Sequence, residues 1–452
     1  MTDFVDRFSE ELKNNGESIK REIDTDLDIE LLEQMEVKFK AIYTRKDVKE
    51  KQDDFRVVAT DAGRNDIELK NNSRIYILQG AAVDNKGGVN KDIDVGSLKI
   101  FKQQDYEKFM QRGSEVVEIK SILKAIENIE EEKLYILIDG TLLTRLLATP
   151  EIFDLSRNRF KSIELMNKFQ KLVEKTVSNE NIVLAGVSKD SNSSLLYRKL
   201  IGDMIEKRVD NLNLSKLDEV SEEDKEYLKN NYHRIRYRPQ DVRRNLENLE
   251  AAGAEKEKIS DIRDLVEQYR TRFSDTEIIE EMTNEKGFTK PLRLGRIKPE
   301  FFSTVEDFQD KGIEFIQNEF TNEEKNPEMD SKKISKVLNR VANSPGVISS
   351  YWKPSENDTP LRIDLLNHDV DGKKLMDCSE QEFVDCEPKL RDILELLKTG
   401  YAGEGMHNVW ISQADNSASL KNRDIENIYK PVLEKNLGIN LRNYMRRRDK
   451  RV

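Results

Sequence analysis

The 452-residue chain has few of the residues that build the most familiar sites, and each scarcity excludes a class of protein. Its two cysteines, Cys378 and Cys386, form no CxxC pair, so the sequence predicts neither a disulfide framework nor a zinc site. Three histidines are too few for a His-rich metal site. A bound metal would therefore have mainly carboxylate ligands, which suits Mg²⁺ or Mn²⁺.

Long apolar runs are also missing from the sequence. No stretch approaches the roughly 20 apolar residues that a membrane span needs, and the N-terminal residues lack the apolar core of a signal peptide. We therefore expect a soluble protein of the cytoplasm that has no membrane partner.

Positive charge is in the minority, since 76 Lys and Arg face 87 Asp and Glu and give a formal net charge of -11. The molecule as a whole does not attract nucleic acid, so any such binding needs a local basic patch or bound metal ions. The length suits two or three domains, or one core domain with large insertions.

The periodicity of the apolar residues divides the chain into five segments. Three consecutive strand patterns, at 55–60, 74–83 and 98–102, have short links and predict an antiparallel meander. Two helix–strand units after it predict strands parallel to the first, and the continuous apolar run 134–138 is typical of a strand covered on both faces. The strand patterns 347–353 and 361–366 flank a polar turn and predict a hairpin. The result is an α/β fold with a mixed sheet, flanking helices and a large helical insertion. The segments are an N-terminal helical part (1–50), the first part of the core (51–191), the helical insertion (192–300), the second part of the core (301–440) and a basic tail (441–452).

Two of the expected strands lead into an aspartate followed by a glycine turn. Asp61 follows an apolar run and Gly63 is expected to break the strand, while Asp139 and Gly140 repeat the pattern. If the two strands are neighbours, the carboxylates emerge together, where they would repel each other unless a divalent cation binds them. The alternative is a pair of structural Asp-Gly turns.

Further side chains could complete such a site. Glu118, or its near neighbour Glu115, lies on the intervening helix and could supply a third oxygen. On a helix, His407 and Asp415 would lie on roughly one face, because they are eight residues apart, and Asp415 could then join the cluster. Equally, His407 could lie near the start of a helix and Asp415 could face water. Lys189, just after the fifth strand, could neutralise a phosphate or position the attacking water, or could be a solvated loop lysine.

An arginine-rich stretch stands out in the helical insertion. Arg234, Arg236 and Arg238 alternate, so an extended segment would present them on one face, where they could bind phosphate. The alternative is internal ion pairing with the many acidic residues between 217 and 256.

Taken together, the motifs resemble those of the NurA nucleases over roughly residues 50–435. The resemblance rests on their order, and the motifs are the strand ending in Asp61, Ile138-Asp139-Gly140-Thr141-Leu142, Ala185-Gly186-Val187-Ser188-Lys189, Tyr351-Trp352 with Leu361-Arg362-Ile363-Asp364, and Ala414-Asp415. It implies an RNase H-like fold and a homodimeric, Mn²⁺- or Mg²⁺-dependent nuclease. Such enzymes cut single-stranded DNA 5′ to 3′ and also endonucleolytically. Their usual partner is the hexameric HerA ATPase, with which they resect DNA ends for repair.

The resemblance also assigns roles to individual residues. Asp61 and Asp139 look like the two metal aspartates and Glu118 like the helix glutamate, while Lys189 resembles the lysine after the fifth strand. Asp415 stands where the family usually has a histidine and His407 where it has a tyrosine, and aspartate can still ligate Mn²⁺. Pairing Tyr401 with His407 is a second alignment. The residues expected to contact DNA are Arg64, Lys189, Arg234, Arg236, Arg238 and Arg362.

The departure at Asp415 leaves a second function open, a non-catalytic RNase H-like module that binds DNA or an ATPase. A nuclease of the RNase H or Argonaute type that acts on RNA or hybrids is the runner-up enzyme, and nothing in the sequence favours it.

Overall fold

The computed structural model describes most of the chain. The described residues are 2–23, 29–127, 129, 133–148, 150–157, 159–189, 191–212, 221–223, 239–270, 273–295, 298–312, 314–316, 331–368, 370, 372–378, 380–403 and 406–445. They form two compact units, one of Met1–Tyr43 with Ser194–Phe273 and one of Thr44–Ser193 with Ser274–Val452. The expected insertion and the N-terminal segment thus contribute to one unit, and Arg234, Arg236, Arg238 and the basic 446–448 lie outside the described residues.

The first unit is helical. Within it, α6 packs on α9 and α2, and α8 packs on α9. On α9 the buried side chains Ile259, Ile262 and Val266 recur at helical spacing and form one apolar stripe. Its helices are α1 (Thr2–Ile23), α2 (Ile29–Ile42), α6 (Leu195–Asp210), α8 (Pro239–Ala251) and α9 (Lys256–Arg270).

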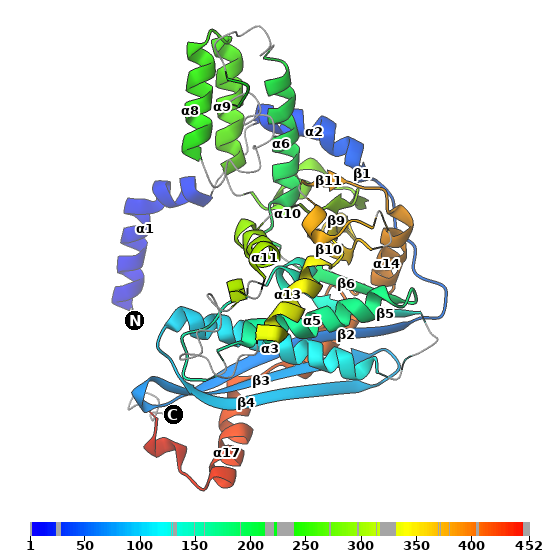
Figure 1. The fold of residues 1–452 in the computed structure, drawn as a ribbon. Helices are drawn as coiled ribbons and strands as arrows, with labels where there is room; N and C mark the ends of the chain where they lie inside the picture. The colour runs from blue at the N-terminus through cyan, green and yellow to red at the C-terminus, as the bar shows by residue number, and fades with distance from the viewer. Residues whose placement is uncertain are drawn as a thin grey trace. The chain divides into compact units, whose positions relative to one another are not determined.

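The second unit is built on a mixed sheet (Figure 1). The meander consists of β2 (Arg56–Glu68), β3 (Ser73–Asp84) and β4 (Val89–Lys99), all antiparallel neighbours. Next to β2 lie β5 (Leu134–Asp139) and then β6 (Ile182–Ser188), both parallel to it.

The sheet continues beyond β6 with antiparallel strands. β10 (Leu361–Leu366) pairs with β6, and β9 (Val347–Lys353) pairs with β10, so the predicted hairpin is confirmed. The order across the unit is β7-β9-β10-β6-β5-β2-β3-β4. The short strands are β1 (Tyr43–Thr44), β7 (Gly287–Thr289), β8 (Leu292–Arg293) and β11 (Glu382–Phe383).

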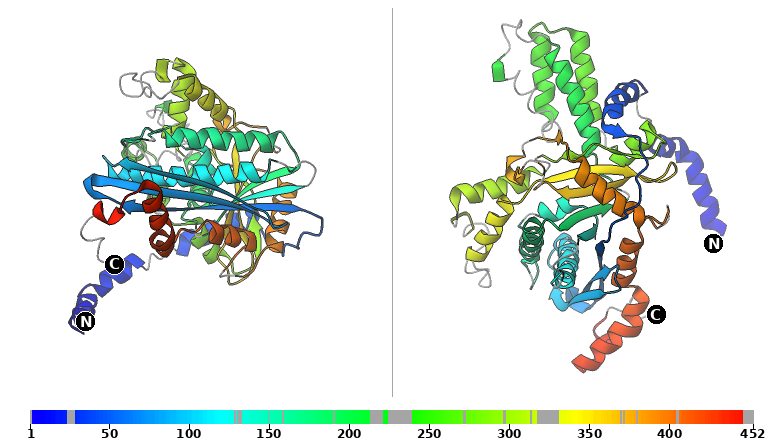
Figure 2. Two further views of the ribbon diagram at one scale, coloured as in Figure 1. Left: turned by 90° about the horizontal axis from the view of Figure 1, so that it is seen from below. Right: turned by 90° about the vertical axis from the view of Figure 1, so that its right-hand side faces the viewer.

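Helices cover both faces of this sheet (Figure 2). α3 (Gln103–Ala125) and α5 (Lys161–Val177) lie on one face, and α14 (Glu387–Thr399) and α15 (Val409–Ala418) lie on the other. The remaining helices are α4 (Leu142–Leu146), α10 (Asp275–Met282), α11 (Pro299–Lys311), α13 (Ser331–Ala342), α16 (Asn422–Asp424) and α17 (Lys430–Leu437). The predicted RNase H-like α/β fold with a mixed sheet is confirmed.

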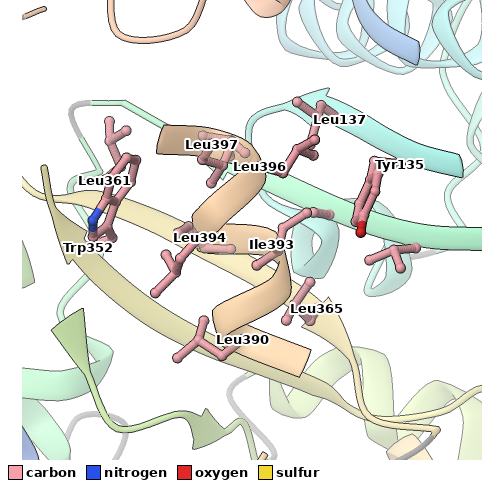
Figure 3. Packing of buried hydrophobic residues seen from close by; sticks show 14 of the residues in the cluster. Tyr135, Leu137, Trp352, Leu361, Leu365, Leu390, Ile393, Leu394, Leu396 and Leu397 are labelled. Carbon is pink, nitrogen blue, oxygen red and sulfur yellow. The ribbon is translucent and has the colours of Figure 1, made fainter. Parts of the chain in front are cut away.

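One part of the core lies between α14 and the sheet (Figure 3). Leu390, Ile393, Leu394 and Leu397 recur every three or four residues along α14 and are buried against strand residues such as Leu137. Both tryptophans of the chain, Trp352 and Trp410, pack in this cluster. Among the described residues, no helix is long and apolar enough to cross a membrane.

Two expected strand limits were wrong. β4 begins at Val89, well before the predicted 98–102, and alternates between exposed and partly buried positions along its length. β2 continues past Asp61 to Glu68, with Asp61 opposite Ala81 and Gly63 opposite Gln79, so Gly63 does not end the strand. The parallel pairing of β2 with β5 does stop just before Asp61, at Thr60.

Candidate active site

The alternation of the strands aims three charged side chains at the same face of the sheet. Ala59 and Leu137 are buried on the α14 and α15 face, and Asp61 and Asp139 follow them by two residues. Since side chains two apart on a strand share a face, both carboxylates point to that side. Lys189 lies just past the end of β6 and follows Val187, which is buried on the same face, by two residues. Lys189 Nζ lies 3.5 Å from Asp139 Oδ2.

Asp61 is the centre of an acidic cluster. Burial raises the pKa of Asp61 to about 7, against a backbone hydrogen bond from Ala62, and the charges of Asp139 and Asp415 raise it further. Asp139 of β5 and Asp415 of α15 are therefore close enough to Asp61 for their negative charges to disfavour its ionised form. The structure therefore brings Asp61, Asp139 and Asp415 together.

Glycines let the two covering helices approach closely at this point. A Cβ on Gly63 would lie 2.1 Å from the carbonyl oxygen of Ala418, at the end of α15. A Cβ on Gly80, the neighbour of Ala62 in the sheet, would lie 2.5 Å from the Val117 carbonyl oxygen of α3. Glycine is therefore needed at position 63 because a helix packs closely against the strand there, and not because the strand ends.

The helix glutamate comes from the other face of the sheet. Glu118 is 2% exposed, and one of its oxygens accepts a 2.7 Å hydrogen bond from Arg145 of α4. Its other oxygen, Oε1, is buried with no hydrogen-bond partner in the described part of the chain. Burial raises the pKa of Glu118 to about 7, although Arg145 pulls it down, and Asp61 and Glu115 raise it further.

Arg145 is a member of the site that sequence reasoning missed. Its guanidinium is buried and also donates to the carbonyl oxygens of Thr141 at 3.0 Å and Asp139 at 3.1 Å. It thus ties Glu118 to the turn that follows Asp139. The available signal was its position inside an apolar run, Leu142-Leu143-Thr144-Arg145-Leu146-Leu147, where an arginine must have buried partners.

The alternative helix glutamate, Glu115, is engaged elsewhere. Its carboxylate accepts a 2.9 Å hydrogen bond from Arg112, one turn earlier on α3. Glu118 is therefore the better placed of the two toward Asp61.

The expectation that His407 and Asp415 share one helix is wrong. α15 starts at Val409, with Asn408 as its N-cap, and His407 before it has a left-handed backbone with φ of 55°. His407 Nδ1 lies 3.8 Å from Asp358 Oδ1, and Tyr401 donates a 2.7 Å hydrogen bond to the same carboxylate. The site residue on α15 is Asp415, and His407 belongs to a separate group with Asp358 and Tyr401.

The two arginines expected to contact DNA in this unit differ in exposure. Arg64 is exposed on β2, on the face that carries α3. Arg362 is buried and donates to Asp364 at 2.9 Å and to Ser349 at 3.0 Å. Because Asp364 in turn accepts the backbone N–H of Leu142 at 3.1 Å, Arg362 holds the start of α4 in place and has no free surface for DNA.

These residues together define what the site can do chemically. Among the described residues, no three His, Cys, Asp or Glu side chains converge tightly enough to hold a metal ion as they stand. Two features fit a cation nevertheless, the unpartnered Oε1 of Glu118 and the neighbouring charges of Asp139 and Asp415, which raise the pKa of Asp61. Clustered carboxylates on an RNase H-like sheet define the class as an α/β protein with an acidic site suited to divalent cations.

Comparison with known proteins identifies the family. The NurA domain model matches residues 55–420, and the chain therefore belongs to the NurA family of nucleases. The crystal structure of the NurA nuclease from Sulfolobus solfataricus is similar over 97% of this chain and 99% of that one, at 16% identity and a TM-score of 0.51. A NurA structure bound to dAMP and manganese matches 100% of this chain and 99% of that one, at 14% identity and a TM-score of 0.40. No curated protein matches the sequence.

Proposed function

We propose that the chain is a Mn²⁺- or Mg²⁺-dependent deoxyribonuclease that acts on single-stranded DNA, 5′ to 3′ and endonucleolytically. The observation that carries the proposal is the convergence of Asp61, Asp139 and Asp415 beside Glu118 in a member of the NurA family. In this proposal the protein is a cytoplasmic homodimer that works with a HerA-type ATPase in DNA end resection and repair. Manganese and dAMP in a NurA structure agree with the choice of metal and substrate.

The four carboxylates would hold the metal ion. A bound Mn²⁺ or Mg²⁺ supplies a water of lowered pKa and stabilises charge that develops on a phosphodiester. The chain's own residues do the rest: Asp61, whose pKa is raised to about 7, gives up its proton, and Glu118 offers its unpartnered oxygen. Lys189, held 3.5 Å from Asp139, is placed to pair with a phosphate oxygen of the bound strand.

The test compares Asp61→Asn with a matched acidic control. Purified full-length chain is incubated with 5′-labelled single-stranded DNA and Mn²⁺, and we expect Asp61→Asn to lose at least 100-fold in cleavage rate, on the order of one electrostatic catalytic contact. Asp385→Asn is the control, because its side chain is 92% exposed and lies outside the cluster. Equal cleavage by wild type and Asp61→Asn would refute the assignment.

One observation favours a second function, a non-catalytic module that binds DNA or an ATPase. Arg145 already neutralises Glu118, so the site reaches partial charge balance without a metal ion. DNA binding by the wild type with no Mn²⁺- or Mg²⁺-dependent cleavage would support this second function over the first.

A further inference from the structure

A groove on the helical face of the sheet carries the opposite charge to the rest of the molecule. It lies along α3 and α5, has a volume of about 900 Å³ and is open to solvent. Three acidic residues line it, Asp92, Glu127 and Glu174. Its six basic residues are Lys120, Lys124, Lys168, Lys171, Lys175 and Arg340, and we call this set the lysine groove. The local excess of three positive charges stands against a net charge of -11 for the chain.

Internal ion pairs account for only part of this positive charge. Lys124 is paired with Asp92, and Arg340 lies 2.9 Å from Glu174. The ammonium groups of Lys168, Lys171 and Lys175, by contrast, make no ion pair or hydrogen bond with any residue that the structure describes.

The three unpaired lysines form a row. They follow one another at intervals of three and four residues on α5, so they share one face of the helix. Like charges at this spacing repel each other. Burial, together with the ammonium groups of Lys171 and Lys120, lowers the pKa of Lys168. A polyanion with regularly spaced charges would reduce the repulsion within this row, which has no internal partner.

The lysine groove lies on the α3 and α5 face of the sheet, the face from which Glu118 enters the proposed active site, whereas Asp61, Asp139 and Asp415 belong to the opposite face. Lys120 is two residues after Glu118 on α3 and Lys124 is four residues further, so both lie within about 9 Å of Glu118 along the helix axis. A second hollow, of about 730 Å³, continues it between α5 and α13 and shares Glu174 and Arg340. A chain-like ligand could therefore follow a continuous path over these helices.

From these observations we propose that the lysine groove binds the sugar-phosphate backbone of single-stranded DNA outside the acidic cluster. Lysine ammonium groups bind phosphates as point charges without reading the base sequence, so the contact is independent of sequence. The inference rests on the proposed nuclease function, because that function supplies the DNA. The lysine groove adds a second contact that keeps the DNA strand bound while cleavage changes the end of that DNA strand.

The test measures binding without cleavage. Anisotropy of a fluorescein-labelled thymidine 30-mer is recorded in EDTA from 50 to 200 mM salt. The groove variant carries Lys→Gln at 168, 171 and 175, which keeps good helix formers. The control variant carries Lys→Gln at 46, 49 and 435, exposed positions of the same unit that remove the same charge.

Each lysine that contacts a phosphate contributes about 0.7 to the slope of log affinity against log salt for single strands. We expect the groove variant to lose about 2 from that slope. The ratio of the DNA affinity of the wild type to that of the groove variant then falls about 20-fold between 50 and 200 mM salt. The control keeps the wild-type slope. Unchanged affinity and slope in the groove variant would overturn the proposal. The proposal would also be overturned if the groove variant lost binding to an acidic protein but kept its binding to DNA.

A second measurement uses the wild-type protein, so that its result does not depend on whether the groove variant folds normally. Bound 30-mer should protect Lys168, Lys171 and Lys175 of the wild type from acetylation, detected by mass spectrometry, and equal labelling with and without DNA contradicts the proposal. The outcome is separable from the nuclease test. If Asp61→Asn abolishes cleavage but the groove variant binds normally, the groove proposal alone fails. If the groove variant loses salt-dependent binding but wild type cuts nothing with Mn²⁺, the nuclease proposal alone fails.

Discussion

Replacing Arg145 by methionine should destabilise the sheet unit in a way that depends on pH. Methionine keeps the length of the side chain but removes the charge that faces Glu118, 2.7 Å away in a buried contact. Removing one partner of a buried ion pair costs about 3–5 kcal/mol. Because the variant can protonate Glu118 instead of leaving it charged, we expect the lower end of this range, about 3 kcal/mol at pH 7.

The dependence on pH follows from the proton on Glu118. In the unfolded chain its pKa is near 4.5, so the unfolded state has lost this proton well below pH 7, and in the wild-type fold its pKa is about 7. The variant, lacking Arg145, keeps the proton above pH 7, so its folded state binds more protons than its unfolded state. The free energy of unfolding must then fall as the pH rises, by up to about 1.4 kcal/mol per pH unit. In the wild type this contribution is flat above about pH 7.

Urea unfolding followed by tryptophan fluorescence measures this directly. Trp352 and Trp410, the two tryptophans of the chain, both lie in the sheet unit, so the signal reports on that unit. The double variant Glu118→Gln with Arg145→Met is the matched control, since it removes both charges and should lose the extra slope between pH 7 and 9. If Arg145→Met costs under 1 kcal/mol, or has the same pH slope as the double variant, then the buried ion pair is not what positions Glu118.

The remaining predictions concern the close packing and the protons of the site. Gly63→Ala should cost about 1–3 kcal/mol in urea unfolding, because its Cβ meets the carbonyl oxygen of Ala418, whereas Gly88→Ala, whose Cβ meets nothing within 3.4 Å, should cost much less. Equal costs would contradict the packing argument. The free energy of unfolding of the wild type should fall from about pH 4.5 to about 7, since folded Asp61 and Glu118 keep protons that the unfolded chain has lost. Added Mn²⁺ should raise the unfolding midpoint more at pH 8 than at pH 6, as those protons compete with the metal, and an equal rise at both would contradict this.

Much of the site could be predicted because strands impose a simple rule on the sequence. A continuous apolar run marked β5 as a strand covered on both faces, and β6 was predicted as the fifth strand. Once these strands are parallel neighbours, alternation alone sends Asp139 and Lys189 to one face. The meander and the hairpin of β9 and β10 were likewise readable from local patterns and turn residues.

The rest depended on contacts between distant parts of the chain, which local patterns do not encode. The length of β2 could not be read from Gly63, since this glycine serves the approach of α15 from 355 residues further along the chain. The role of Arg362 could not be predicted for the same reason. Its partner Asp364 lies on the same strand, but the backbone that Asp364 holds is the start of α4, which is distant in the sequence. His407 was misplaced by an error of only two residues in the start of a helix.

Arg145 connects the two functions that remain open for this chain. With every group ionised, the four carboxylates of Asp61, Glu118, Asp139 and Asp415 carry -4 and the two cations Arg145 and Lys189 carry +2, which leaves -2 for a single divalent ion to balance. Without a metal ion, the raised pKa values of Asp61 and Glu118 reduce that charge by protonation instead. The same cluster can therefore exist as a protonated, folded module or as a metal site. The guanidinium of Arg145 is compatible with both states, because it occupies one oxygen of Glu118 and leaves the other for a proton or a cation.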